Sequence, residues 1–218
     1  MKRVFALPTA LLVAGCDSPL STLAPAGPVA SDIAWLWGVM LVGAGLITAL
    51  VIVLIILAFR RPSETNARFW THGMGLWFSM IVLTLLLGAG LWVGERIQPR
   101  DDEAVIVRAH AFQWGWEFSH EGPDGDMIAS SDLLHIPAGR PVDVLITAED
   151  VIHSFWVPRL AGKMDAIPGR TNRTRLVADS PGEYDGLCAE FCGLDHAFMR
   201  FSVQAHENWP PDLSEAAQ

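Results

Sequence analysis

The stretch CAEFCGLDHAFM, residues 188–199, holds two thiols, one imidazole and one thioether, on Cys188, Cys192, His196 and Met199. Thiolate, imidazole and thioether together suit copper better than any other common biological metal. A site with a single blue copper uses one Cys, two His and an axial Met, so the second Cys makes this donor set too rich for one copper. Two bridging thiolates would instead hold two coppers, each completed by its own imidazole. His153, in the segment VIHSFWVP, is the candidate for the second imidazole.

Two other readings of the same residues are open. Cys188 and Cys192 would form a disulfide if the domain faces an oxidising compartment. Together with His153 and His196 they would also make a ligand set for a structural zinc ion. Neither alternative explains why Met199 follows His196 by three positions. The sequence therefore favours copper.

Charge is distributed unevenly along the chain. The 218 residues carry a formal net charge of −9, and 51% of them are hydrophobic. Residues 101–218 contain 20 acidic and 8 basic side chains, so the acidity belongs to the C-terminal half. An acidic domain argues against nucleic acid as a partner and favours a basic protein, because complementary fields speed association. The alternative is that the acidity only keeps the domain soluble.

The first residues have the pattern of a secretory signal. Met1, Lys2 and Arg3 precede an apolar run that ends in VAGC, residues 13–16. This ending resembles a bacterial lipobox, so residues 1–16 are expected to be a signal peptide with Cys16 as the lipidated residue. Plain cleavage, or an uncleaved leader, is the alternative. Residues 17–31 are rich in Pro, Ser, Ala and Gly and predict a flexible tether.

Two long apolar runs predict a transmembrane hairpin within residues 32–98. The runs cover about 33–59 and 74–94, and each is long enough for a bilayer core of roughly 30 Å. Arg60, Arg61 and Arg68 lie between them, whereas residues 17–31 have no Lys or Arg. The positive-inside rule places the 60–72 loop in the cytoplasm and everything after residue 95 outside. Because only two transmembrane helices are predicted, we expect the chain to be an accessory subunit bound to a larger membrane subunit.

From residue 101 the pattern changes to short runs rich in Val, Ile, Trp and Phe, separated by Pro-Gly and Pro-Asp-Gly turns. Seven or eight short strands over residues 101–206 predict an all-β, antiparallel Greek-key sandwich. The expected strands are 104–109, 112–118, 132–136, 141–147, 152–157, 171–177, 182–187 and 199–205. Loops at one end of such a sandwich can bring residue 153 to the 188–199 segment. No function is assigned to the tail, residues 207–218.

The two motifs together resemble subunit II of the haem–copper cytochrome c oxidases. The resemblance implies a cupredoxin-like domain whose binuclear copper centre is held by His153, Cys188, Cys192, His196, Met199 and the backbone carbonyl of Glu190. It also implies that the Glu190 side chain reaches a magnesium ion shared with subunit I. Such a site has no open position for a substrate, so it is expected to move electrons.

The segment QWGW, residues 113–116, supplies the expected point of electron arrival. The resemblance implies that Trp114 faces cytochrome c, the electron donor, although Phe112 and Gly115 differ from many family members. The alternative for Trp114 is packing in a strand core. The resemblance further implies that electrons pass to haem in subunit I, where oxygen would be reduced to water and protons pumped. This implies a multi-pass protein of the bacterial inner membrane with its copper domain on the periplasmic face.

Two other functional classes are open. One is a structural subunit of the quinol oxidase type, which has the same architecture without copper ligands; the other is a membrane-tethered copper carrier. The remaining polar residues are expected to be structural or on the surface. They are the acidic residues Glu149, Asp150, Asp165, Asp185 and Asp195 and the histidines His72, His110, His120, His135 and His206.

Overall fold

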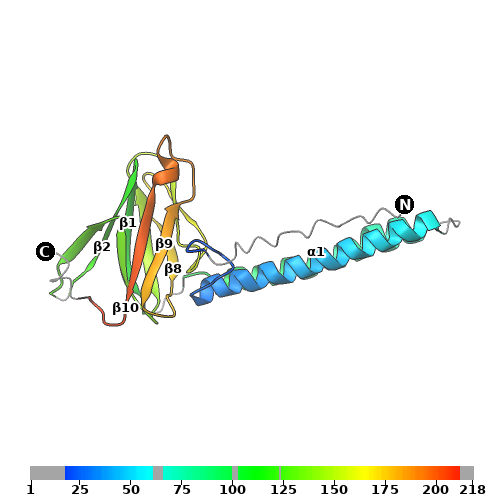
Figure 1. Cartoon of the computed structure of the whole chain (residues 1–218), viewed down its shortest axis with the longest axis horizontal. Helices are drawn as coiled ribbons and strands as arrows, with labels where there is room; N and C mark the ends of the chain where they lie inside the picture. Colours follow the sequence, from blue (N-terminus) through cyan, green and yellow to red (C-terminus); the bar gives the residue numbers. More distant parts are fainter. Residues whose placement is uncertain (1–17, 61–65, 100–102, 123, 212–218) are drawn as a thin grey trace, which may run out of the picture.

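A pair of long helices and a β-sandwich make up the molecule (Figure 1). The computed structural model describes residues 18–60, 66–99, 103–122 and 124–211. The predicted signal peptide and Cys16, the loop at 61–65 and the last residues of the tail lie outside these ranges.

Two helices are long and apolar enough to cross a membrane, as predicted. The first, α1, covers Pro28–Arg60, and the second consists of a π-helical segment, Phe69–Phe78, followed by α2, Ser79–Arg96. Both helices begin earlier than the predicted 33 and 74. Pro28 is compatible with this start, because the first helical N–H has no partner within the helix and proline has none to offer.

The two helices are joined near the β-sandwich. Arg96 Nε of α2 donates a hydrogen bond to Asp32 Oδ2 of α1 at 2.9 Å. Trp35 and Trp92 make an edge-to-face contact at 5.8 Å between ring centroids, and the Arg96 guanidinium lies 4.9 Å from the Trp92 ring centroid. Trp35 and Trp92 therefore contribute to the contact between the two helices.

The segment before α1 is bound to the β-sandwich, so the prediction of a flexible tether was wrong for residues 24–31. Ala26 N–H donates to the Arg159 carbonyl at 2.7 Å, and Asp179 N–H donates to the Ala26 carbonyl at 2.9 Å. Arg159 Nε donates to the Ala24 carbonyl at 2.8 Å. These hydrogen bonds, two between backbone groups and one from the Arg159 side chain, hold the start of α1 against the domain, and composition alone does not reveal them.

Two five-stranded sheets form the sandwich. One has the order β3-β2-β1-β5-β8 and the other β4-β10-β9-β6-β7. The strands are β1 Val105–Phe112, β2 Gly115–Glu121, β3 Met127–Ser131, β4 Leu133–Pro137, β5 Val142–Ala148, β6 His153–Trp156, β7 Met164–Ala166, β8 Asn172–Leu176, β9 Gly182–Cys188 and β10 Arg200–His206. The all-β prediction is confirmed, and the short strands β3 and β7 were missed.

The sheets are mixed, so the purely antiparallel prediction was wrong. Strand β1 runs parallel to β5, with Val107 opposite Val144, and β10 runs parallel to β4, with Val203 opposite Leu134. Each pair is separated in sequence by several strands, which gives the chain room to return to the same end. The chain passes from β3 in the first sheet to β4 in the second at Asp132, whose φ is +52°.

Aromatic side chains fill the space between the sheets. Trp116 and Phe118 come from β2, Phe155 from β6 and Phe201 from β10, and all four are buried. The rings of Phe155 and Phe201 stack at 4.9 Å between centroids, and Trp116 lies 5.4 Å from Phe201. This rigid core supports the strand ends from which the candidate site is built.

Candidate metal centre

Strand ends bring the predicted ligands together at one end of the sandwich. The segment 189–199 connects β9 to β10 and contains a short 3-10 helix, His196–Phe198; in Figure 1 it lies at the top of the domain. Phe155 of β6 is opposite Cys188 of β9, which places His153 beside the connection. Cys188 N–H donates to the Met199 carbonyl at 2.9 Å and closes the loop.

The two thiols are separate, and each lies beside its own imidazole. Sγ of Cys188 lies 3.8 Å from Sγ of Cys192, far longer than a disulfide bond of about 2.05 Å. Cys188 Sγ is 4.0 Å from His153 Nδ1, and Cys192 Sγ is 3.5 Å from His196 Nδ1. The arrangement is therefore two sulfurs in the middle with one imidazole on each side.

The thioether and one backbone carbonyl complete the cluster. Met199 Sδ lies 3.2 Å from His153 Nδ1 and 3.7 Å from Cys192 Sγ. The Glu190 carbonyl oxygen lies 3.2 Å from Cys188 Sγ. Thus all six groups that the resemblance implied are neighbours in space, including the carbonyl whose direction the sequence could not give.

Burial and ligand chemistry fit a soft metal. His153, Cys188, Cys192 and Met199 are each at most 3% exposed. His153, Cys188 and Cys192 also have their ligand atoms within 4.8 Å of one another. Burial, reinforced by Cys188, raises the pKa of the Cys192 thiol to about 12. A metal ion would replace that proton, since thiolate is the form that binds metals.

Asp150 orients His153, and the prediction that it is only a surface charge was wrong. His153 Nε2 lies 2.8 Å from Asp150 Oδ1, which leaves Nδ1 facing the sulfurs. Asp150 also accepts from the N–H groups of Val151 and Gln113. Burial opposes the effect, but these hydrogen bonds hold the pKa of Asp150 below its usual range. The sequence feature that could have revealed this role is the position of Asp150, three residues before His153.

Trp114 lies over the ligand loop, whereas Trp116 is in the core. The Trp114 side chain is 36% exposed. Gln113 Nε2 donates to the Cys192 carbonyl at 2.7 Å and ties this turn to the loop. Gly193 has a φ of +128°, and a Cβ there would lie 3.0 Å from Trp114 Cζ2. Packing in a strand core was the alternative prediction for Trp114. In the structure this ring lies beside the cluster of thiols and imidazoles instead.

The Glu190 side chain points to a different environment from its carbonyl. It is 46% exposed, and its Oε2 lies 3.2 Å from Lys163 Nζ. Lys163 Nζ also donates to Asp165 Oδ1 at 3.0 Å, and Ser154 donates to the same oxygen at 2.8 Å. The bonds to Asp165 and Glu190 raise the pKa of Lys163, and the bonds from Lys163 and Ser154 lower the pKa of Asp165.

The ligand loop also carries large exposed apolar side chains. Phe191 is 76% exposed, Leu194 92% and Phe198 80%. Ile152 and Trp114, from neighbouring loops, extend this apolar tip. A contiguous exposed apolar surface is typical of an interaction site.

Comparisons with known proteins agree on one family. Residues 119–206 match the family described as cytochrome c oxidase subunit II, periplasmic domain. The cytochrome c oxidase subunit 2 of Alkalihalophilus pseudofirmus is 32% identical over 219 aligned positions, which cover 90% of this chain and 62% of that protein. The chain thus spans about three fifths of the length of this relative.

Two solved structures are also similar. One is the periplasmic domain of subunit II of cytochrome oxidase from Bradyrhizobium japonicum, with 30% identity, 55% of this chain and 91% of that chain covered, and a TM-score of 0.45. The other is a haem–copper terminal oxidase dimer, with 21% identity, 62% and 99% covered, and a TM-score of 0.48. The family match and the sequence relative agree: the chain is similar to members of the cytochrome c oxidase subunit II family.

Proposed function

We propose that this chain is the electron-accepting subunit of a cytochrome c oxidase. It takes electrons from cytochrome c at a binuclear copper centre and passes them to haem in subunit I. There oxygen is reduced to water and protons are pumped. One observation carries the proposal: two unbonded, buried thiols lie 3.8 Å apart, and each has its own imidazole.

The donor set indicates which residues would hold the copper pair. Cys188 and Cys192 would bridge as thiolates, His153 and His196 would each bind at one side, and Met199 and the Glu190 carbonyl would be the weak outer ligands. When bound, the copper pair supplies a one-electron redox centre. The protein donors fill the cluster and leave no position for a substrate, so electron transfer is the chemistry that fits.

The surrounding residues keep these donors in place. Asp150 fixes the ring of His153 through Nε2, and Gln113 holds the loop at the Cys192 carbonyl. Such outer hydrogen bonds orient metal ligands and tune their basicity. Burial excludes water, so donors that hardly move between the two redox states would allow fast electron transfer.

The donor would approach at the apolar tip beside Trp114. Asp150 and Asp195 add negative charge near this surface, which suits a basic cytochrome c. The Glu190 and Asp165 carboxylates face outward on another side of the loop. We place the proposed magnesium ion, shared with subunit I, at Glu190.

Membrane attachment follows from the two apolar helices. We propose a bacterial inner-membrane protein with the 60–72 loop in the cytoplasm and the β-sandwich in the periplasm. Lipidation at Cys16 would add a second anchor.

Copper loading of the full chain tests the proposal. The detergent-solubilised protein should bind two coppers per chain. Electron spin resonance should show one unpaired spin that is shared by two equivalent copper nuclei. The matched control is His110→Gln, which changes a histidine of β1 whose Nδ1 pairs with Thr147 instead of a thiol. A single-copper spectrum, or a bond between Cys188 and Cys192 in the isolated protein, would overturn the proposal.

A further inference from the structure

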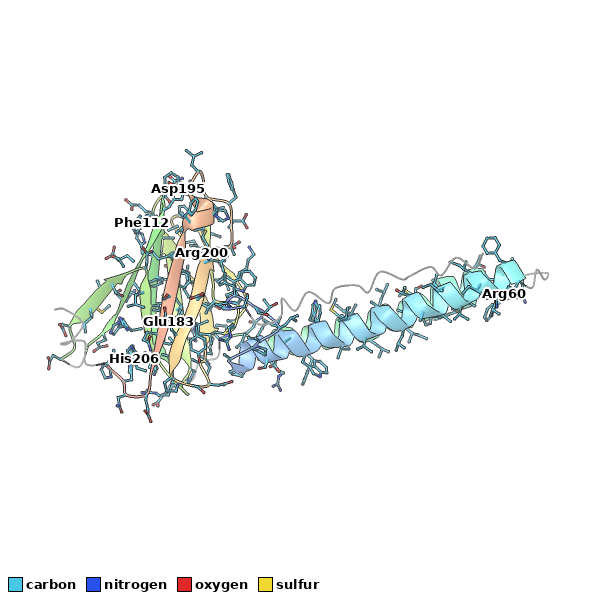
Figure 2. All side chains as sticks on the ribbon, in the orientation of Figure 1. Arg60, Phe112, Glu183, Asp195, Arg200 and His206 are labelled. Atoms are coloured by element: carbon cyan, nitrogen blue, oxygen red, sulfur yellow. The ribbon has the colours of Figure 1, made fainter. Side chains whose placement is uncertain are left out.

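Three histidines gather at the opposite end of the sandwich from the ligand loop. His120 lies in β2, His135 in β4 and His206 at the end of β10. His135 Nδ1 lies 2.8 Å from His206 Nε2, and the His120 ring centroid lies 5.7 Å from that of His135. Figure 2 shows His206 and Asp195 at opposite ends of the domain. This histidine cluster is therefore distinct from the copper site.

The cluster holds neutral imidazoles, of which His120 and His135 are buried and His206 is half-buried. His120 is 1% exposed and His135 is 7% exposed. Burial and the neighbouring His206 lower the pKa of His120, and burial with both neighbours lowers the pKa of His135 to about 4. Neutral imidazole is the form that binds metal ions. His120 Nε2 is buried and has no hydrogen-bond partner among the described residues. A native buried nitrogen of this kind calls for an explanation, such as an ion.

The ring spacing suits one shared ion. Two imidazoles on a tetrahedral zinc, with Zn–N distances of about 2.0–2.1 Å, have ring centroids roughly 5 Å apart. The His135 and His206 centroids are 5.1 Å apart, and those of His120 and His135 are 5.7 Å apart. The nitrogens of all three do not yet converge to within 4.8 Å. His135 and His206 already meet through Nδ1 and Nε2 at 2.8 Å, so a shared ion requires His120 to move toward this pair.

We propose that His120, His135 and His206 bind a divalent transition-metal ion, with Zn²⁺ as the best match. The cluster has imidazoles and no sulfur donor, a ligand set that suits Zn²⁺ and differs from the soft sulfur donors of the other site. Trp209 packs on His120 at 5.1 Å between ring centroids, and Pro211 is buried. Bound zinc would thus fasten the segment after β10 across this end of the sandwich.

Zinc titration of the full chain tests this inference. Cys188→Ser with Cys192→Ser removes both sulfur donors of the ligand loop and so weakens any Zn²⁺ binding there. This background should bind one Zn²⁺ per chain, measured by calorimetry and metal analysis. Adding His206→Gln should weaken binding by more than about tenfold, the smallest loss expected even for an outer-shell partner. His110→Gln, the matched half-buried control in β1, should leave the affinity unchanged.

A second measurement covers the case in which the chain with Cys188→Ser and Cys192→Ser does not fold. The copper-loaded wild-type chain, whose thiols are occupied, is titrated with Co²⁺ as an optical probe. Tetrahedral imidazole ligation should appear without a thiolate charge-transfer band, and His206→Gln should abolish it. Absence of bound Zn²⁺ and Co²⁺, or binding that survives His206→Gln, overturns the inference. Neither result bears on the copper proposal, because copper loading is read separately.

Discussion

Histidine side chains have different hydrogen-bond partners at the two ends of the β-sandwich. At the ligand loop, His153 pairs through Nε2 with the Asp150 carboxylate, and its Nδ1 faces two sulfurs. At the other end, His135 pairs with His206, another imidazole, and His120 Nε2 has no partner among the described residues. Strand β10 connects the two ends, which are roughly 20 Å apart along its seven residues.

The difference teaches that burial alone does not define a metal site. Both ends bury imidazoles, but only the loop end adds thiols and a carboxylate that fixes one ring. A ring fixed in this way presents a chosen nitrogen to a metal. At the cluster end, His135 and His206 are paired with each other, and His120 Nε2 has no hydrogen-bond partner among the described residues.

The largest effect is expected for Cys192→Ser. It removes one of the two thiolates proposed to bridge the copper pair, so the spin shared by two copper nuclei should disappear from the resonance spectrum. The histidine cluster should be unaffected, since the two sites share no residue. A variant that keeps the two-nucleus signal would show that Cys192 is not a bridge and would remove the contrast between the ends.

The second-largest effect is expected in the pH dependence of the free energy of unfolding, and it comes from the histidine cluster. The folded-state pKa of His135 is about 4, below the unfolded value of 6.5, so the folded state binds fewer protons than the unfolded state between these values. Stability is therefore full above about pH 6.5 and is lost as the pH falls towards about 4. At 1.36 kcal/mol per pKa unit, His135 contributes at most about 3 kcal/mol.

Denaturant unfolding of the metal-free full chain, with a chelator present, measures this effect. His135→Gln should flatten the pH dependence between about pH 6.5 and 4, whereas His110→Gln should keep it. Equal slopes in the wild type and His135→Gln would mean that the cluster does not titrate as described.

A smaller effect is expected for Asp150→Asn. The amide still fills the space but cannot accept from His153 Nε2 with the strength of a carboxylate. Copper affinity should fall by roughly 10–100-fold, the range seen for outer-shell partners. Asp195→Asn, an exposed acid on the ligand loop between β9 and β10, is the control. If both variants behave alike, the role of Asp150 is only that of a surface charge.

The smallest effect is expected for Trp209→Ala. This change removes the ring contact with His120 and should lower the free energy of unfolding by about 1 kcal/mol. Copper loading should not change, because the tail is remote from the ligand loop. Loss of copper in this variant would show that the two ends are coupled through β10.

Much of the site was predictable because its donors are rare residue types at short spacing. Cys188, Cys192, His196 and Met199 lie in one loop, so their proximity follows from chain connectivity. Asp150 and Gln113 were missed as supporting residues, because an acid or amide in a loop is usually solvated. Their role depends on which strand ends meet, and pairing between distant strands has no local signal.

The histidine cluster shows the same limit more strongly. His120, His135 and His206 are spread over 87 positions and were predicted to be structural or on the surface. Each of the three histidines occupies an ordinary position in its strand. No local sequence feature therefore indicates that they form a cluster. They become neighbours only because β2 and β4 belong to sheets that face each other, with β10 beside β4.

The sequence by itself determined the two apolar helices, the all-β domain and the kind of donor atoms in the ligand loop. These properties depend on apolar run length, turn residues and side-chain chemistry, which are local. Only the tertiary structure decided that the sheets are mixed, that residues 24–31 dock on the domain and that Asp150 orients His153. The physical reason is that these features rest on hydrogen bonds between segments far apart in the chain, whose pairing is set by packing of the whole core.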